Sequence, residues 1–271
     1  MTTDGTVLVV LPTLGDRLET LDETLQAIDD QRRDVPLHLV IAMPARATKA
    51  RELAERHGAT VVDDPGTGIS DAINAAVAVA TSETYYAWMG DDDLFRPGGL
   101  RRLRDLLEAD PKATVAFGGC DYIDPEGRVI GTSRAGRLAR VLLPWGPNLI
   151  PHPGSMIRLD AMRKVGVFDP KLRYAMDLDM FLRLRSTGRY VSTRASVSAF
   201  RWHPDSLTVA NRAASSAEAE AIKRRHLPAW LRWAAPAWEI PVRWAASRAA
   251  VAMSARARAL AARDERTPAA A

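Results

Sequence analysis

The sequence predicts an α/β domain with a mostly parallel central sheet and helices on both of its faces. Two observations lead to this fold class: the alternation of two sequence patterns along the chain, and the length and composition of the chain. Short runs rich in Val, Ile and Leu alternate with longer segments whose apolar residues recur at helical spacing. Strands that alternate with helices of this length form right-handed βαβ units, which build parallel sheets. A chain of 271 residues, 47% hydrophobic and 26% charged, has room for one such globular domain with an appendage.

The first part of the chain repeats the strand and helix pattern. Strands are predicted at Val7 to Leu11, Leu37 to Ala42, Thr60 to Val62, Tyr85 to Met89, and Thr114 to Phe117. Helices are predicted at 18–28, 46–57 and 69–80, and Pro97 begins a fourth; Gly58 ends the second.

The pattern weakens between Asp121 and about Pro147, which indicates an irregular connection. It resumes near Ile150, with helices at 162–165 and 177–185, a turn at 166–170, and a strand at 190–199. Beyond residue 215 the composition shifts to Ala, Arg and Trp. We therefore expect one domain over 1–215, with halves at about 1–120 and 145–215, and a helical tail over 216–271.

Three adjacent carboxylates, Asp91, Asp92 and Asp93, follow the fourth predicted strand. Ligands of such sheets bind beyond the carboxyl ends of the strands. Like charges this close repel one another, and a hard divalent cation removes that cost. Oxygen ligands suit Mg²⁺ or Mn²⁺ better than zinc. The alternative is a solvated acidic loop that caps the next helix.

Three segments together make the chain resemble family 2 of the glycosyltransferases over roughly residues 7 to 205. They are VLVVLPTLGDRLETLDETLQAI, DDPGTGISDAINAAVAVATSETYYAWMGDDDLF and YAMDLDMFLRL. Their order and spacing match the strand-one, donor-loop, metal and base-helix elements of that family. The resemblance implies a Rossmann-like GT-A fold and an inverting, metal-dependent sugar transfer. Residues 1–120 would then hold the nucleotide-sugar and residues 145–215 the acceptor.

The resemblance assigns the donor site to two loops. The loop after strand one maps nucleotide contacts onto Pro12 and Thr13, with Asp16 and Arg17 as further contacts; a plain turn and helix cap is the alternative. In the second loop, Asp64 would meet the base, and Asp71 or Asn74 would bond the ribose or hold the loop. A structural N-cap at Ser70 is the alternative there.

The choice of metal ligand within the acidic run stays open. An Asp-x-Asp pattern selects Asp91 and Asp93, whereas alignment on Leu94-Phe95 selects Asp92. We expect Asp93 or Asp92 to bind the cation, with Asp91 and Asp92 near the donor. Related enzymes also place acceptor-site or metal-completing residues where this chain has His152 and His203, and the ring of Trp202 could stack on a sugar. We assign His203 to the metal and the other two to the acceptor; structural roles are the alternative.

The resemblance makes Asp177 the general base, because it occupies the acidic position at the start of the acceptor-side helix. A carboxylate there can take the proton of an acceptor hydroxyl as its oxygen attacks the anomeric carbon. Met176 stands where the family commonly has Glu. The alternative is that Asp177 only caps the helix. Asp179 is expected to pair with an arginine.

The donor base stays open because Ala42-Met43-Pro44-Ala45 replaces the family's usual acidic, Gly and Ser residues after strand two. A UDP-sugar is the default donor, and GDP- and dTDP-sugars are the alternatives. Two other functions compete with sugar transfer. A nucleotidyltransferase would need a glycine- and basic-rich triphosphate loop, which residues 11–18 do not supply. A non-catalytic membrane-associated scaffold would use only the tail.

The tail carries the basic charge of the chain. Residues 222–271 hold ten Lys or Arg against three acids, and four of the seven tryptophans lie within residues 230–244. This composition suits an anionic membrane surface and a lipid-linked acceptor, or packing on the domain or a partner. Pro236 and Pro241 are expected to break the tail helix. The rest of the chain is too acidic to form a nucleic-acid-binding surface.

The sequence also gives an expectation for localisation. The single cysteine, Cys120, indicates a reducing compartment, and the N-terminus lacks a basic region and reads as a first strand rather than a signal peptide. We therefore expect a cytoplasmic protein, peripheral on the inner face of the cell membrane.

Overall fold

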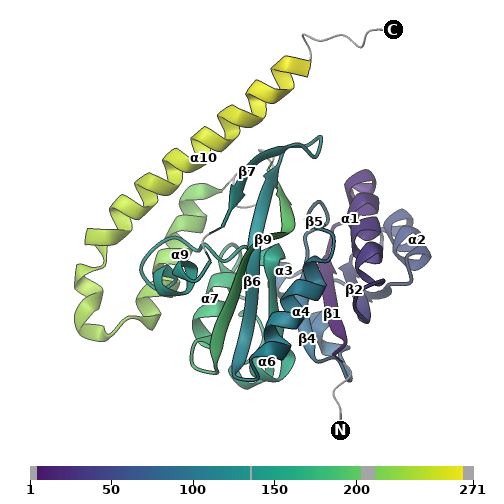
Figure 1. Cartoon of the computed structure of the whole chain (residues 1–271), viewed down its shortest axis with the longest axis horizontal. Helices are drawn as coiled ribbons and strands as arrows, with labels where there is room; N and C mark the ends of the chain where they lie inside the picture. The colour runs from purple at the N-terminus through teal and green to yellow at the C-terminus, as the bar shows by residue number, and fades with distance from the viewer. Residues whose placement is uncertain (1–4, 135, 203–210, 265–271) are drawn as a thin grey trace.

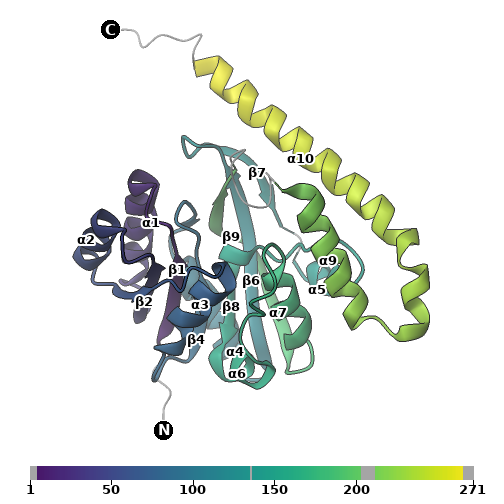
Figure 2. The same cartoon turned by 180° about the vertical axis from the view of Figure 1, so that it is seen from behind.

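The computed structural model describes residues 5–134, 136–202 and 211–264, with side chains up to residue 260 (Figures 1 and 2). Its strands are β1 (Val7–Pro12), β2 (Leu37–Met43), β3 (Thr60–Asp63), β4 (Tyr85–Trp88), β5 (Leu94–Phe95), β6 (Ala113–Ile123), β7 (Val129–Ser133), β8 (Ser155–Arg158) and β9 (Arg189–Arg201). Its helices are α1 (Leu18–Gln31), α2 (Thr48–Arg56), α3 (Ile69–Ala78), α4 (Gly99–Ala109), α5 (Leu138–Leu142), α6 (Leu159–Val165), α7 (Met176–Leu184), α9 (Arg212–His226) and α10 (Pro236–Asp264), with short 3₁₀ turns η1 (His152–Gly154) and η2 (Ala229–Ala234).

The described strands form one sheet in the order β3-β2-β1-β4-β8-β6-β9-β5, and β7 pairs with β6. The first four strands are parallel, as are β6 and β9, while β5, β7 and β8 are antiparallel to their neighbours. The carboxyl ends of β1, β3 and β4 therefore lie at one edge of the sheet, where the sequence places the predicted donor residues.

Alternating side chains of the central strands build two cores, one on each face of the sheet. Leu8 and Val10 pack with α3, α6 and α7, whereas Val7 and Val9 pack with α1, α2 and α4. Figures 1 and 2 show these two groups of helices on opposite faces. The α/β fold with helices on both faces is therefore confirmed.

The structure differs from the expected irregular connection between residues 121 and 147. Strand β6 continues to Ile123, β7 returns beside it as a hairpin, and α5 follows. The short strands β5 and β8 were also not predicted. Two to four residues cannot display a periodicity, and these strands depend on pairing with β9 and with β4 and β6.

Only one of the two expected proline breaks is present: the turn η2 ends at Ala234 and α10 begins at Pro236, but Pro241 causes no break. Helix α10 runs without interruption through Pro241. Pro236 is its first residue, where a missing N–H costs nothing. Pro241 leaves only the Ala237 carbonyl without its helical donor, and Ala237 is exposed, so water can serve it. None of the helices in the described part of the chain is both long and apolar enough to cross a bilayer.

The tail packs on the domain through α9. The predicted domain boundary near residue 215 lies within this helix. Buried Lys223 of α9 donates to the Gly146 carbonyl at 2.5 Å. Arg224 pairs with buried Glu239 of α10, the Nε to Oε1 distance being 2.9 Å. Helix α9 therefore connects α10 to the second half of the sheet.

Candidate functional site

Residues after β1 and β4 form a hydrogen-bonded cluster at the carboxyl edge of the sheet. The Thr13 hydroxyl donates to Asp91 Oδ2 at 2.6 Å. The Arg17 guanidinium pairs with Asp91 Oδ1 at 2.6 Å and with Asp92 Oδ2 at 2.7 Å. Burial raises the pKa of Asp91, and Thr13 and Arg17 oppose that shift. The predicted donor and acidic residues are thus neighbours in space, although they lie 74 or more positions apart in the sequence.

Asp93 is buried and forms hydrogen bonds with other parts of the protein. Its Oδ1 accepts from the Arg201 backbone N–H at 3.0 Å, and its carbonyl accepts from the Thr24 hydroxyl at 2.9 Å. The buried Arg201 side chain donates to the Asp92 carbonyl at 3.0 Å and pairs with Glu23 at 2.6 Å. Burial, followed by the charge of Asp92, raises the pKa of Asp93 well above its usual range. Asp93 therefore fixes the loop against β9.

The donor set at this edge fits a hard cation only in part. The described residues include no group of three His, Cys, Asp or Glu side chains placed to hold a metal ion. Asp91 and Asp92 nevertheless offer adjacent carboxylate oxygens, already gathered around one cation, the Arg17 guanidinium. Mg²⁺ sites that bind nucleotides characteristically use one or two carboxylates and complete the shell with phosphate oxygens and water. Asp92 is the most accessible of the three aspartates.

The other predicted donor residues lie in β1 and α3 and in the loops beside them. Asp64 follows β3, and its Oδ1 accepts from the Gly66 N–H at 2.9 Å. Asp71 accepts from the Thr67 hydroxyl. Asn74 instead reaches the second half of the chain, donating to the Phe168 carbonyl at 2.8 Å and accepting from its N–H at 3.0 Å. Pro12 is partly buried at the end of β1, and Asp16 is exposed.

The N-cap alternative for Ser70 was wrong, because Gly68 occupies the cap position of α3. The buried Ser70 hydroxyl donates to the Leu172 carbonyl at 3.0 Å instead. Together with Asn74, it ties α3 to the segment that precedes α7.

Asp177 lies half-buried in the first turn of α7. Its Oδ2 accepts from Asn148 Nδ2 at 3.0 Å, and its Oδ1 from the Leu178 N–H at 2.7 Å. Burial raises the pKa of Asp177 to about 6, although both hydrogen bonds favour the charged form. Ala175 holds the N-cap position of α7, but the Asp177 carboxylate accepts a backbone N–H of the first turn, as the capping alternative expects.

Asp177 lines a small cavity beside β4. Its lining includes Asp177, His152, Ser155 and the ring of Tyr86. The His152 ring packs against Trp88, which lies three residues before Asp91, and burial lowers the pKa of His152 well below its ordinary value. His152 is therefore neutral and lies between the acidic run and the predicted base.

Trp202 and Asp179 contact other parts of the protein. The Trp202 indole N–H donates to Ser254 Oγ of α10 at 3.1 Å, and its ring packs edge-on against Tyr122. Asp179 pairs with Arg183 at 2.8 Å, which confirms the expected arginine partner. His203, the third predicted metal residue, lies outside the described residues.

Sequence reasoning missed Glu218 of α9, which accepts hydrogen bonds from three consecutive backbone N–H groups before α7. Its Oε1 lies 2.7 Å from the nitrogens of Tyr174 and Ala175, and its Oε2 lies 3.0 Å from that of Arg173. Free N–H groups at a helix start attract negative charge. Glu218 thus holds the start of the Asp177 helix, and nothing local in the sequence indicates this contact.

Replacing Glu218 with Gln is expected to shift the acid limb of the pH–rate profile to lower pH. After burial and the hydrogen bonds, the charge of Glu218 is a further influence on Asp177, and it raises the pKa of that group. Removing the charge lets Asp177 ionise at lower pH. Glu218→Ala also loses the three bonds, and should lower the free energy of unfolding by about 1–3 kcal/mol. The measurements are kcat against pH and thermal melting.

Glu220→Gln is the matched control for these variants, because Glu220 lies on the same helix but pairs with Arg243 at 3.3 Å. It should leave the acid limb unchanged. An equal pH shift in both variants would show that Glu218 has no special link to Asp177.

Comparisons with known proteins identify the family of the chain. The sequence pattern of Glycosyl transferase family 2 matches residues 8–166. Two uncharacterised glycosyltransferases, from Rickettsia felis and Rickettsia typhi, are 23% and 26% identical over 124 and 129 residues, 43% and 44% of this chain. Those matches cover only 20% and 40% of the two relatives' own lengths.

Solved structures share the fold. A mannosyltransferase from Pyrobaculum calidifontis, solved with GDP-Man and Mn²⁺, superposes with a TM-score of 0.64 at 20% identity, over 94% of this chain and 80% of that one. Residues 1–349 of S. aureus TarS, in complex with UDP-GlcNAc, superpose with a TM-score of 0.62 at 13% identity, over 82% and 65% of the two chains. With more than half of its length matched by the family pattern, the chain belongs to glycosyl transferase family 2.

Proposed function

We propose that the chain transfers a sugar, with inversion, from a nucleoside diphosphate sugar to a hydroxyl group of a glycan or a lipid-linked acceptor. The observation that carries this proposal is the placement of Asp177. It is a half-buried carboxylate with a pKa of about 6, and it lines a small cavity together with His152, whose ring packs against Trp88 at the end of β4. An acid near the donor edge with this pKa suits general base catalysis at neutral pH.

Asp177 would take the proton of the acceptor hydroxyl. The hydroxyl oxygen then forms a bond to the anomeric carbon as the bond from that carbon to the diphosphate oxygen breaks. Asn148 and the Leu178 N–H hold the carboxylate in one orientation for this transfer. Neutral His152, in the same cavity, is available to bond the acceptor.

The donor would lie along the carboxyl edge, with Thr13 and Arg17 beside the nucleotide and Asp91 toward the ribose or sugar. We assign Mn²⁺ or Mg²⁺ to Asp92, because Asp93 is buried against Arg201. The cation, when bound, stabilises the charge that develops on the leaving diphosphate. Arg17, which pairs with both aspartates, would contact the diphosphate.

Two further features remain proposals. UDP-sugar is the default donor, and the complexes of the structural relatives, with UDP-GlcNAc and GDP-Man, keep both UDP and GDP donors in the test. An acceptor carried by a lipid would bring the enzyme to a membrane surface. Family membership favours sugar transfer over the nucleotidyltransferase and scaffold alternatives.

The test is the release of nucleoside diphosphate from a panel of UDP-, GDP- and dTDP-sugars, with Mn²⁺ or with EDTA. One class of donor should support release, only with the cation, and NMR of the product should show an inverted anomeric centre. Retention of configuration would contradict Asp177 as a simple base. Absence of release with every donor would contradict the proposal itself.

A further inference from the structure

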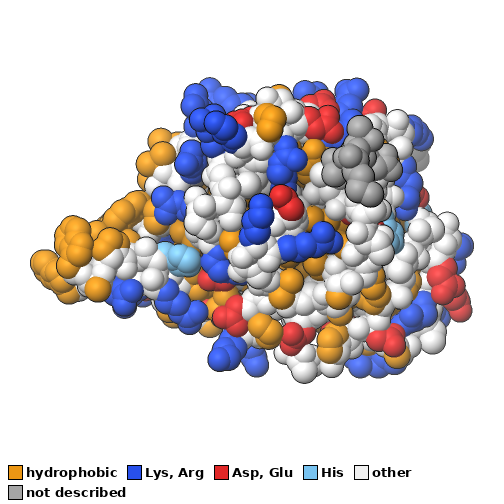
Figure 3. All heavy atoms as spheres, turned by 90° about the horizontal axis from the view of Figure 1, so that it is seen from below, with side chains coloured by type: hydrophobic (Ala, Val, Ile, Leu, Met, Phe, Trp, Pro, Cys, Tyr) orange, Lys and Arg blue, Asp and Glu red, His pale blue; other side chains and the backbone are white. Residues whose placement is uncertain are grey.

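Residues 229–251 of the tail expose large apolar side chains that the surface of a soluble protein seldom leaves uncovered. The exposed fractions are 72% for Trp230, 82% for Trp233 and 64% for Trp244, and Ile240 and Val251 are also exposed. Figure 3 shows hydrophobic side chains gathered on the projecting tip of the molecule, where Figure 1 places the turn between α9 and α10. We call residues 229–251 the tail tip. Such a patch marks an interaction site.

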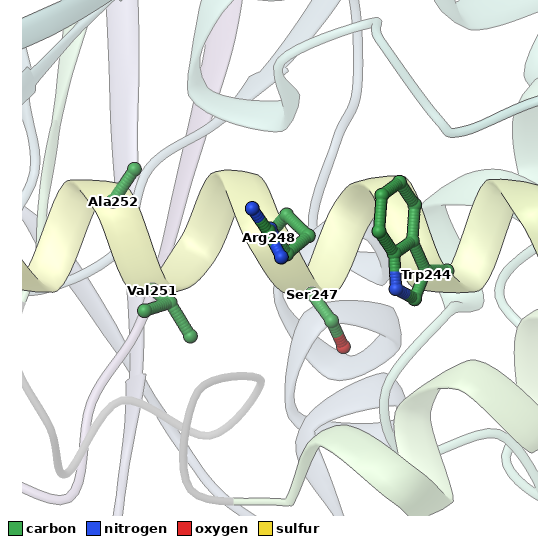
Figure 4. A pocket seen from close by; sticks show the side chains of 5 residues that line it. All are labelled: Trp244, Ser247, Arg248, Val251 and Ala252. Carbon is green, nitrogen blue, oxygen red and sulfur yellow. The ribbon is translucent and has the colours of Figure 1, made fainter.

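The charge of this region is one-sided. Between Leu227 and Leu260 the sequence has five arginines and one acid, Glu239. Glu239 is buried and paired with Arg224, so it offers no charge to a partner. Arg248 lies over the Trp244 ring, 5.2 Å from its centre. Figure 4 shows both on one stretch of α10, beside Ser247, Val251 and Ala252, which line a shallow hollow.

Indoles and arginines side by side suit the interface of an anionic bilayer. Tryptophan favours the headgroup region, because its ring is apolar and its N–H is polar. Arginines next to it can contact lipid phosphates. A second copy of the chain fits poorly, because two tail tips facing each other would bring arginine against arginine with no exposed acid between them.

We propose that the tail tip docks on an anionic phospholipid surface, with Trp230, Trp233 and Trp244 at headgroup depth. The docking proposal rests on the proposed function in one respect: the purpose of docking would be to bring a lipid-linked acceptor to the enzyme. Helix α9 joins the docked tip to the site, because its Arg224 holds α10 and its Glu218 holds the start of the Asp177 helix.

The experiment is co-sedimentation of the full chain with vesicles of phosphatidylcholine alone or with 30% phosphatidylglycerol, without sugar donor. The wild type should bind the anionic vesicles, with a blue shift of its tryptophan emission. The triple variant Trp230→Ala, Trp233→Ala, Trp244→Ala should lower the partition coefficient by about tenfold or more. Reversal of Arg232, Arg243 and Arg248 to Glu should lower it by at least about tenfold as well.

The matched control reverses three exposed arginines elsewhere, Arg33→Glu, Arg56→Glu and Arg101→Glu, and should change binding little. Circular dichroism checks that each variant is folded. If one of the two tail variants does not fold, the other still tests the proposal. Equal binding to both vesicle types, equal losses in the control, or a dimer in sedimentation velocity that the Trp variant dissociates would each overturn the proposal. A chain that transfers sugar but ignores vesicles refutes docking alone, and one that binds but does not transfer refutes the proposed function alone.

Discussion

Asp177→Asn should lower kcat for sugar transfer by about 10²- to 10⁴-fold, the usual contribution of a general base. The affinity for the nucleotide should not change, because Asp177 is on the acceptor side and none of its described contacts reaches the acidic run. An asparagine can still accept the Leu178 N–H. The measurements are single-turnover rates with the preferred donor and nucleotide binding by calorimetry.

The pH dependence gives a second measure of the same group. The carboxyl must be ionised to accept a proton, so wild-type kcat should fall as the pH drops below about 6, the pKa of Asp177. Folding should respond in the opposite sense. The pKa is raised from 3.8 to about 6 on folding, so the folded protein loses stability as the pH rises from about 4 to about 6, and the loss stays constant above that range.

Asp177→Asn should therefore raise the free energy of unfolding at pH 8, on the order of 1–3 kcal/mol, and have little effect at pH 4. A helix-capping carboxylate would show the reverse, with a loss of stability at pH 8. Asp179→Asn is the matched control two residues away: it breaks the ion pair with Arg183 but should keep the transfer rate. Full activity of Asp177→Asn would refute the base assignment.

The parts of the fold and site that the sequence predicts are those with local signals. Apolar runs and helical spacing locate β1 to β4 and their helices, and topology then brings Thr13 beside Asp91. Glu218, Asn148 and Arg201 have no such signal. Each acts through a contact with residues 29 to 109 positions away, which depends on tertiary packing.

Single residues within correctly predicted elements show the same limit. Asn74 has the chemistry of a ribose ligand, yet its amide bonds both backbone groups of Phe168. Pro241 has the strongest propensity to break a helix, yet α10 accepts it because the freed carbonyl faces water. In both cases the surroundings decide the outcome, which are Phe168 for Asn74 and solvent for Pro241. Residue type alone does not predict either one.

The three aspartates of the acidic run should separate by function when each is replaced with Asn. Asp92→Asn should weaken Mn²⁺ binding in the presence of nucleoside diphosphate by more than about 100-fold, because a lost ligand costs at least as much as a lost supporting contact. Asp92 is the most accessible carboxylate, and a cation there would replace the guanidinium of Arg17. Electron paramagnetic resonance of Mn²⁺ measures the bound fraction without any turnover.

Asp93→Asn is the matched comparison, since it makes the same substitution one residue away. Its buried side chain bonds the Arg201 N–H, so it should keep Mn²⁺ affinity within about tenfold of the wild type and act mainly on thermal stability. Asp91→Asn should weaken donor binding more than Mn²⁺ binding, because Thr13 and Arg17 both rely on its carboxylate. Loss of Mn²⁺ in Asp93→Asn with retention in Asp92→Asn would move the ligand to Asp93, and would require the loop that Arg201 fixes to open when the donor binds.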